Sequence, residues 1–281
     1  MKALLGDYPV TAALKEGRIH SDRVRLEFAD IRPPSSGFKR VVRSLEFDIA
    51  ELAITTFLMA RAAGKPLRLL PAVVVGRLQH SFLVCNAERA RLAPKDLRGK
   101  RVGVRSYSVT TGMWIRGILS EDYGVDPDAI TWVTFEEAHV AEFRDPPNVE
   151  RAPAGKDSVG MLLAGEIDAA IVGDGKPADP RIVPVIGDAE AAAQAWRRRK
   201  GAIQINHMVV VKDSVSRAEA EEISRMLGTS IQAAGSPEMN PYGIEANRRN
   251  LEVAIDYVAR QRLIPRRYSV DELFLVERKS G

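Results

Sequence analysis

Strand and helix patterns alternate along almost the whole chain, and this alternation constrains the fold more than any other feature of the sequence. Short apolar runs of strand character, such as 2–6, 47–52 and 102–104, each lead through a loop into a segment with helical periodicity. Such alternation is typical of α/β proteins in which helices cover mostly parallel sheets. The sequence therefore predicts an α/β protein.

The strand and helix alternation begins anew near residue 102, and a chain of 281 residues is long enough for two moderate domains. We expect a first lobe formed by 1–84 together with 208–281 and a second lobe formed by 85–207, with two crossings between the lobes. In bilobed α/β proteins the ligand lies outside the carboxyl ends of the strands, where loops of both lobes meet. A central ligand cleft is therefore part of the predicted fold.

Composition and charge exclude several classes of protein. The net charge of +4 is mild, and the basic runs 197–200 and 266–267 lack interleaved aromatic residues, so we expect no nucleic-acid partner. No stretch is long and apolar enough to span a membrane or to act as a leader, so a cytoplasmic protein without a membrane partner is expected. The single cysteine, Cys85, excludes an internal disulfide and is expected to be a buried strand thiol. The oligomeric state, including a homo-oligomer, stays open.

A hydroxyl-rich loop follows the strand 102–104 and opens a helix that we expect to end at Tyr123. The unpaired N–H groups and the dipole at such a helix start attract anions, and a guanidinium at the end of the strand adds a full positive charge. This segment predicts a site for a small carboxylate or phosphate, although a well-capped helix is the alternative interpretation. The anion-binding candidates here are Arg105, Ser106, Ser108, Thr110 and Thr111.

Three segments together resemble one known family. They are Ser-Leu-Glu-Phe-Asp-Ile-Ala-Glu-Leu at 44–52, the run 105–117 with Trp-Ile-Arg-Gly at its end, and Pro-Tyr-Gly-Ile-Glu-Ala-Asn at 241–247 with Val-Asp-Glu-Leu-Phe at 270–274. In their order and spacing they resemble the 4,5-dihydroxyphthalate decarboxylase family of the type II periplasmic-binding-protein-like superfamily. The resemblance implies the two-lobed fold of that superfamily. It also implies decarboxylation of a hydroxylated aromatic dicarboxylate, in its specific form 4,5-dihydroxyphthalate to protocatechuate.

Decarboxylation of such a ring needs no organic cofactor, because each carboxylate is para to a hydroxyl and its ring carbon can accept a proton before carbon dioxide leaves. The chemistry requires cationic groups for two carboxylates, a general acid at the ring carbon, and an acceptor for the phenols. We expect no cofactor. We also expect no dedicated metal site, since the sequence contains neither His-x-His nor His-Glu-x-x-His spacing.

His80 is the first candidate for the proton donor and His207 is the alternative, because imidazole titrates near neutral pH; a structural role stays open for either. Arg77 and Arg105 are the expected carboxylate clamps, because guanidinium pairs bidentately with carboxylate. The remaining candidates supply hydroxyls, carboxylates or aromatic rings near the expected ends of strands. They are Tyr8, Glu51, Thr55, Thr56, Ser106, Ser108, Thr110, Thr111, Asp174 and Tyr242.

Two further features of the sequence have a structural interpretation beside a functional one. Trp114 could stack on an aromatic substrate, but its place inside a helix favours core packing. The run Glu136-Glu137-Ala138-His139 resembles a ligand cluster, and a solvated segment is the expected outcome.

Two other functions fit the same pattern. A solute-binding protein that delivers an aromatic carboxylate to an ABC-type transporter would have the same fold and cleft. A pyrimidine- or menaquinone-precursor enzyme would share the cleft but not the three segments.

Overall fold

The computed structural model describes residues 1–173 and 177–274, and within them the chain divides into two compact units. Unit 1 comprises 1–77, 139–141 and the chain from Ala202 onwards, and unit 2 comprises 78–138 and 142–201. The chain passes between the units at 77/78 and 201/202, a few residues before the expected boundaries at 84/85 and 207/208. Residues 139–141, which we assigned to the second lobe, belong to unit 1.

The sheet of unit 1 has the strand order β2-β1-β3-β11-β4. Its strands are β1 (Lys2–Leu4), β2 (Glu27–Phe28), β3 (Ile49–Ala53), β4 (Leu67–Gly76) and β11 (Ile205–Lys212). β1 pairs in parallel with β2 and β3, whereas β11 pairs antiparallel with β3 and with β4. The expectation of mostly parallel strands is therefore wrong for β11. This strand comes after the residues of unit 2 in the chain and lies between β3 and β4.

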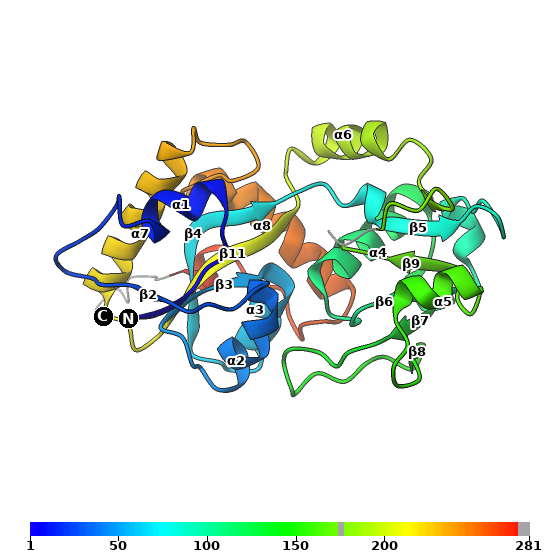
Figure 1. The fold of residues 1–281 in the computed structure, drawn as a ribbon, viewed down its shortest axis with the longest axis horizontal. Coiled ribbons are helices and arrows are strands. Elements are labelled where there is room, and N and C mark those ends of the chain that lie inside the picture. The colour runs from blue at the N-terminus through cyan, green and yellow to red at the C-terminus, as the bar shows by residue number, and fades with distance from the viewer. Residues whose placement is uncertain (174–176, 275–281) are drawn as a thin grey trace. The chain divides into compact units, whose positions relative to one another are not determined.

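Five α-helices and two short 3₁₀ turns accompany this sheet in the described residues. They are α1 (Pro9–Lys15), α2 (Phe38–Arg43), α3 (Ile54–Ala62), α7 (Arg217–Ala233), α8 (Ile244–Arg260), η1 (Pro34–Gly37) and η5 (Asp271–Leu273). α1 and α7 lie side by side, and their apolar faces pack against alternate strand residues such as Leu70, Ala72 and Val209 (Figure 1). α3 and α8 contact each other and β11. Burial of these apolar side chains is the main force that holds unit 1 together.

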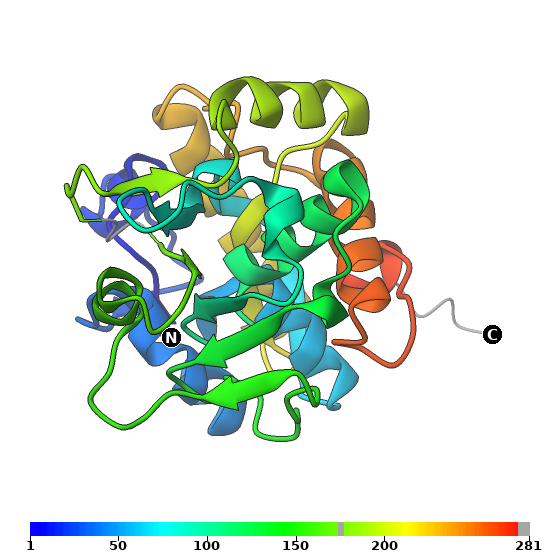
Figure 2. The same ribbon diagram turned by 90° about the vertical axis from the view of Figure 1, so that its right-hand side faces the viewer.

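The sheet of unit 2 has the strand order β10-β5-β9-β6-β7-β8. Its strands are β5 (Leu83–Asn86), β6 (Arg101–Val104), β7 (Thr131–Thr134), β8 (Val149–Arg151), β9 (Ala169–Ile171) and β10 (Ile182–Pro184). β6, β7, β8 and β9 form parallel pairs, and β5 is antiparallel to β9 and β10. Figure 2 faces this unit and shows β7 and β8 lying next to each other.

The described helices of unit 2 are α4 (Thr110–Tyr123), α5 (Ser158–Ala164), α6 (Ala189–Lys200) and the short 3₁₀ turns η2 (His80–Phe82), η3 (Pro94–Leu97) and η4 (Pro127–Ala129). α4 ends at Tyr123, as the sequence predicts, and Gly124 follows it in the left-handed conformation with φ of 65°. η2 lies directly before β5, which begins at Leu83.

All three tryptophans lie in unit 2 and are fully buried: Trp114, Trp132 and Trp196. The rings of Trp114 and Trp196 meet edge to face, with 5.9 Å between their centroids. Core packing is therefore the role of Trp114. Cys85 is buried in β5 as a free thiol, which confirms that expectation.

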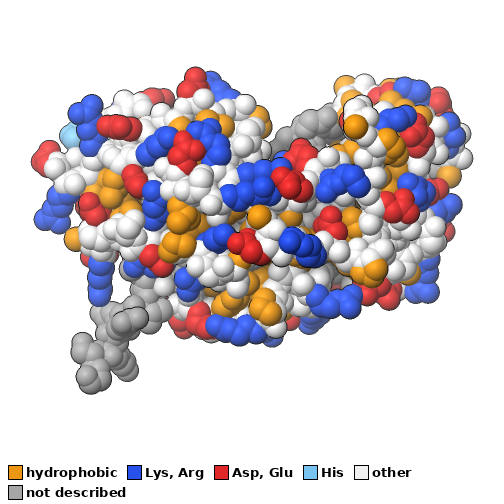
Figure 3. Space-filling model, turned by 90° about the horizontal axis from the view of Figure 1, so that it is seen from below, with side chains coloured by type: hydrophobic (Ala, Val, Ile, Leu, Met, Phe, Trp, Pro, Cys, Tyr) orange, Lys and Arg blue, Asp and Glu red, His pale blue; other side chains and the backbone are white. Residues whose placement is uncertain are grey.

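The surface carries charges of both signs. Figure 3 shows Lys and Arg side chains interspersed with Asp and Glu side chains on the face it presents. Among the described residues, no helix combines the length and the apolar character that crossing a membrane requires.

Candidate functional site

Glu51 is the centre of a buried polar cluster in unit 1. It lies in β3, whose residues are all buried, and its side chain has no exposed surface. Its Oε1 accepts a hydrogen bond from the Tyr8 hydroxyl at 2.8 Å and lies 2.8 Å from His207 Nδ1. Its Oε2 accepts the backbone N–H of Gly6. A buried carboxylate is stable only when such donors replace water, and here three donors surround it.

His207 reaches Glu51 because of the register of β11 on β3. Val209 lies directly opposite Glu51, so His207, two residues earlier on the same face, is a diagonal neighbour. The ring of Phe38 in α2 meets His207 edge to face at 5.1 Å between centroids, and 14% of the His207 side chain stays exposed. The carboxylate thus orients the ring through Nδ1. Nε2, on the other side of the ring, faces away from that bond.

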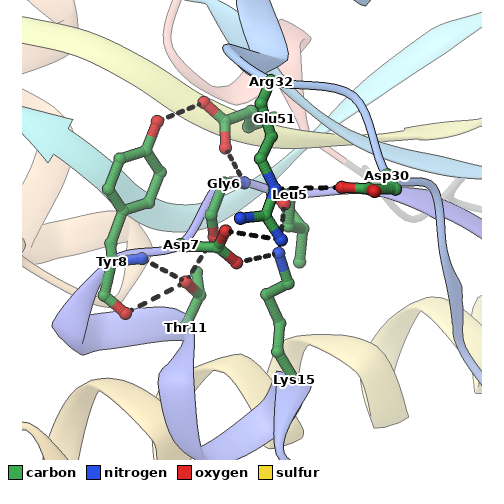
Figure 4. A network of polar contacts seen from close by, with 9 residues as sticks. All are labelled: Leu5, Gly6, Asp7, Tyr8, Thr11, Lys15, Asp30, Arg32 and Glu51. Carbon is green, nitrogen blue, oxygen red and sulfur yellow. Dashed lines mark hydrogen bonds and ion pairs between the residues drawn. The ribbon is translucent and has the colours of Figure 1, made fainter.

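The loop between β1 and α1 brings Tyr8 to Glu51 (Figure 4). Thr11 holds this loop, because its hydroxyl donates to the Gly6 carbonyl at 2.7 Å and accepts the Tyr8 N–H at 3.0 Å. Lys15 donates to the Leu5 carbonyl at 3.0 Å and also pairs with Asp7. The loop is therefore fixed on both sides of Tyr8.

A second histidine lies in the same unit. His139 is buried, and its Nδ1 is 2.9 Å from the hydroxyl of Thr56 in the first turn of α3. Its ring meets Phe38 edge to face at 5.6 Å between centroids, so Phe38 has an imidazole on two sides. The expectation that the segment ending at His139 is solvated is wrong for this residue, because Phe38 and Thr56 cover it. It is right for Glu136 and Glu137, which are exposed.

The structure places His80 in the core of unit 2. Its side chain is fully buried in η2, and the ring meets Trp196 edge to face at 6.4 Å between centroids. In the part of the chain that the structure describes, neither ring nitrogen has a hydrogen-bond partner. Burial lowers the His80 pKa from 6.5 to about 4. The ring is therefore neutral at pH 7, and it lacks the acidic imidazolium proton that a general acid would donate.

The anion-binding candidates of unit 2 lie together at the start of α4. Arg105 is half exposed and pairs with the equally exposed Glu136 at 3.5 Å. Val109 precedes the first turn, and its side chain makes no capping hydrogen bond. The hydroxyl-bearing residues beside the helix start are all buried. They are Ser106, Ser108, Thr110 and Thr111.

Three other predicted site residues lie in unit 1, and one lies outside the described residues. Arg77 follows β4 in unit 1, and its backbone N–H donates to the Gln204 carbonyl at 3.2 Å. Tyr242 lies at the surface of unit 1, with its hydroxyl 3.0 Å from the Ser224 hydroxyl in α7. Thr55 is buried at the start of α3, and Asp174 lies outside the described residues. Within 1–173 and 177–274, no three His, Cys, Asp or Glu side chains gather as metal ligands would.

Comparison with known proteins places this chain in a family. A family model described as NMT1/THI5 like matches residues 29–146. The 4,5-dihydroxyphthalate decarboxylase of Pseudomonas putida is 30% identical over 207 residues, which cover 69% of this chain and 80% of that protein. The chain belongs to the 4,5-dihydroxyphthalate decarboxylase family. The enzyme of the same name from Comamonas testosteroni is 29% identical over 231 residues, covering 75% of this chain and 68% of that protein.

Solved structures show the fold of this decarboxylase family member. The alkanesulfonate-binding protein SsuA from Xanthomonas axonopodis superposes with a TM-score of 0.59 at 14% identity, over 97% of this chain and 96% of that protein. The desulfurization enzyme DszB superposes with a TM-score of 0.54 at 13% identity, over 99% of this chain and 96% of that protein. The fold is the two-lobed α/β fold of the periplasmic-binding-protein-like superfamily, as the sequence predicts.

Proposed function

We propose that this protein is a carboxy-lyase that converts a hydroxylated aromatic dicarboxylate, specifically 4,5-dihydroxyphthalate, to protocatechuate, with His207 as the proton donor. Two relatives that bear the name of this activity support the reaction. The observation that carries the assignment within this chain is the contact between Glu51 and His207. A carboxylate on one ring nitrogen is the arrangement that fixes an imidazole for acid–base work through the other nitrogen.

The proposed reaction has two steps. His207 in its protonated form gives a proton to the ring carbon that bears one carboxylate, and the para hydroxyl supplies the electron pair that makes this possible. The bond from that carbon to the carboxylate then breaks, carbon dioxide leaves, and the bonding electrons restore the aromatic ring. The proton given up by His207 is replaced from solvent. Glu51 keeps the His207 ring oriented through Nδ1 during both steps.

Turnover of 4,5-dihydroxyphthalate by the purified protein tests the proposal, with protocatechuate measured by chromatography and carbon dioxide measured as released gas. His207→Gln should lower kcat by about 100-fold or more, because general acid catalysis contributes that much. His20→Asn is the matched control, because His20 is exposed. Equal activity in His207→Gln and His20→Asn would exclude His207 as the proton donor.

The fold shared with the alkanesulfonate-binding protein favours one second function, capture of an aromatic carboxylate for a transporter. Calorimetry with 4,5-dihydroxyphthalate, protocatechuate and phthalate separates the two functions. Tight binding of the dicarboxylate without any protocatechuate formed would support the binding protein and reject the enzyme.

A further inference from the structure

The Tyr8 hydroxyl and the His207 ring meet the same oxygen of Glu51. Both contacts measure 2.8 Å to Oε1, while Oε2 takes the Gly6 N–H. Two groups that contact the same carboxylate oxygen are both stabilised by the negative charge on that oxygen. Each of the two contacts therefore changes the strength of the other.

Local structure holds the Tyr8 ring in place. Tyr8 precedes Pro9, the first residue of α1, and Thr11 accepts the Tyr8 N–H at 3.0 Å. The ring lies directly against Gly6, where an added Cβ would come within 2.5 Å of the ring carbon Cζ and 2.6 Å of the hydroxyl oxygen. A glycine at position 6 is therefore required for the hydroxyl to reach Glu51 (Figure 4).

We propose that Tyr8 is a positioning residue for His207, which acts through Glu51 by restraining the carboxylate and sharing its charge. This inference rests on the proposed function, in which His207 is the proton donor. It differs from the stacking role that an aromatic residue at this position suggests, because the end of the side chain that bears the hydroxyl is engaged by Glu51.

Charged and titratable groups from several elements lie around the cluster. Tyr8 from the β1–α1 loop and His207 from β11 face Glu51 directly. His139 and His207 both contact the Phe38 ring. The charges nearest Tyr8 along the loop are paired with one another: Asp7 with Lys15 and Arg32. Tyr8→Phe removes the hydroxyl that bonds to Glu51 and keeps the ion pairs of Asp7.

The test is a titration of the His207 ring by nuclear magnetic resonance, in wild type and in Tyr8→Phe without substrate. The His207 signal is assigned by its loss in His207→Gln. Without the shared donor, Oε1 holds more charge for the imidazole, so the titration midpoint should rise by about 0.5 to 1 pH unit. The alkaline limb of the kcat profile should move upward with it, because the donor stays protonated to higher pH.

Tyr268→Phe is the matched control. It removes a tyrosine hydroxyl from the same unit and keeps the ring, which lies 4.2 Å from the Arg266 guanidinium. Its His207 titration should coincide with that of wild type. A Tyr8→Phe titration that also coincides with wild type overturns the positioning role, whether or not the protein decarboxylates. A shifted titration in a protein that forms no protocatechuate supports the positioning role and rejects only the proposed function.

Discussion

His80 should make unit 2 sensitive to mild acid. The ring has no hydrogen-bond partner in the described residues and is packed against Trp196, so replacing it by an apolar side chain removes no bond. Burial lowers its pKa from 6.5 to about 4, so between these values the unfolded chain binds a proton that the folded chain excludes. Stability must therefore fall as the pH falls through this window.

The size of the effect follows from the two pKa values. Through His80 alone, the free energy of unfolding should drop by about 2 kcal/mol between pH 7 and pH 5, and by about 3 kcal/mol at pH 4. The variant His80→Leu cannot titrate at this position. The two proteins should differ little in stability at pH 7, and His80→Leu should be the more stable one by about 2 kcal/mol at pH 5.

Urea denaturation followed by tryptophan fluorescence reports on the unfolding of unit 2, because Trp114, Trp132 and Trp196 are all buried there. The other three histidines are present in both proteins, so their titration cancels in the comparison. If wild type and His80→Leu lose the same stability between pH 7 and pH 5, the argument from burial is refuted.

Three further predictions concern the two units separately. Glu51→Gln should lower kcat by about 10²- to 10⁴-fold, because the amide carries no charge to hold a protonated His207, while circular dichroism shows a retained fold. Gly76→Ala should destabilise unit 1 by about 1 to 3 kcal/mol, since the new Cβ would lie 2.1 Å from the Met239 carbonyl oxygen; hydrogen exchange along β4 measures this. Arg105→Gln should change the free energy of unfolding by less than about 0.5 kcal/mol, because the ion pair of Arg105 is exposed. The same variant should raise KM for the dicarboxylate, and an unchanged KM would exclude Arg105 as a carboxylate clamp.

The sequence predicts the elements well where their signal is local. The helix expected to end at Tyr123 does so, because an apolar stripe and Gly124 mark its course and its end within the segment itself. β8 escapes prediction for the opposite reason. It has three residues, of which Glu150 and Arg151 are exposed and charged, and it is a strand only because β7 pairs with it.

The candidate site is predicted as a set of residues but not as an arrangement. Tyr8, Glu51 and His207 are all named from the sequence, yet the contact between Glu51 and His207 depends on how β11 is registered against β3, which is a property of the folded sheet. His139 comes shortly after two exposed glutamates, and such a local sequence is typical of a solvated segment. It becomes buried only because Phe38, about a hundred positions earlier, covers it.

The central place of β11 in unit 1 has a consequence for biosynthesis. β11 separates β3 from β4, so the sheet of unit 1 cannot close until the ribosome has delivered residue 212, after nearly all of the β-strands of both units. Unit 2, which comprises 78–138 and 142–201, is complete in the nascent chain at Gly201. The inserted unit can therefore fold first. Until β11 has been synthesised, Glu51 in the N-terminal part of unit 1 stays exposed to water, because the strand that carries His207 is not yet present.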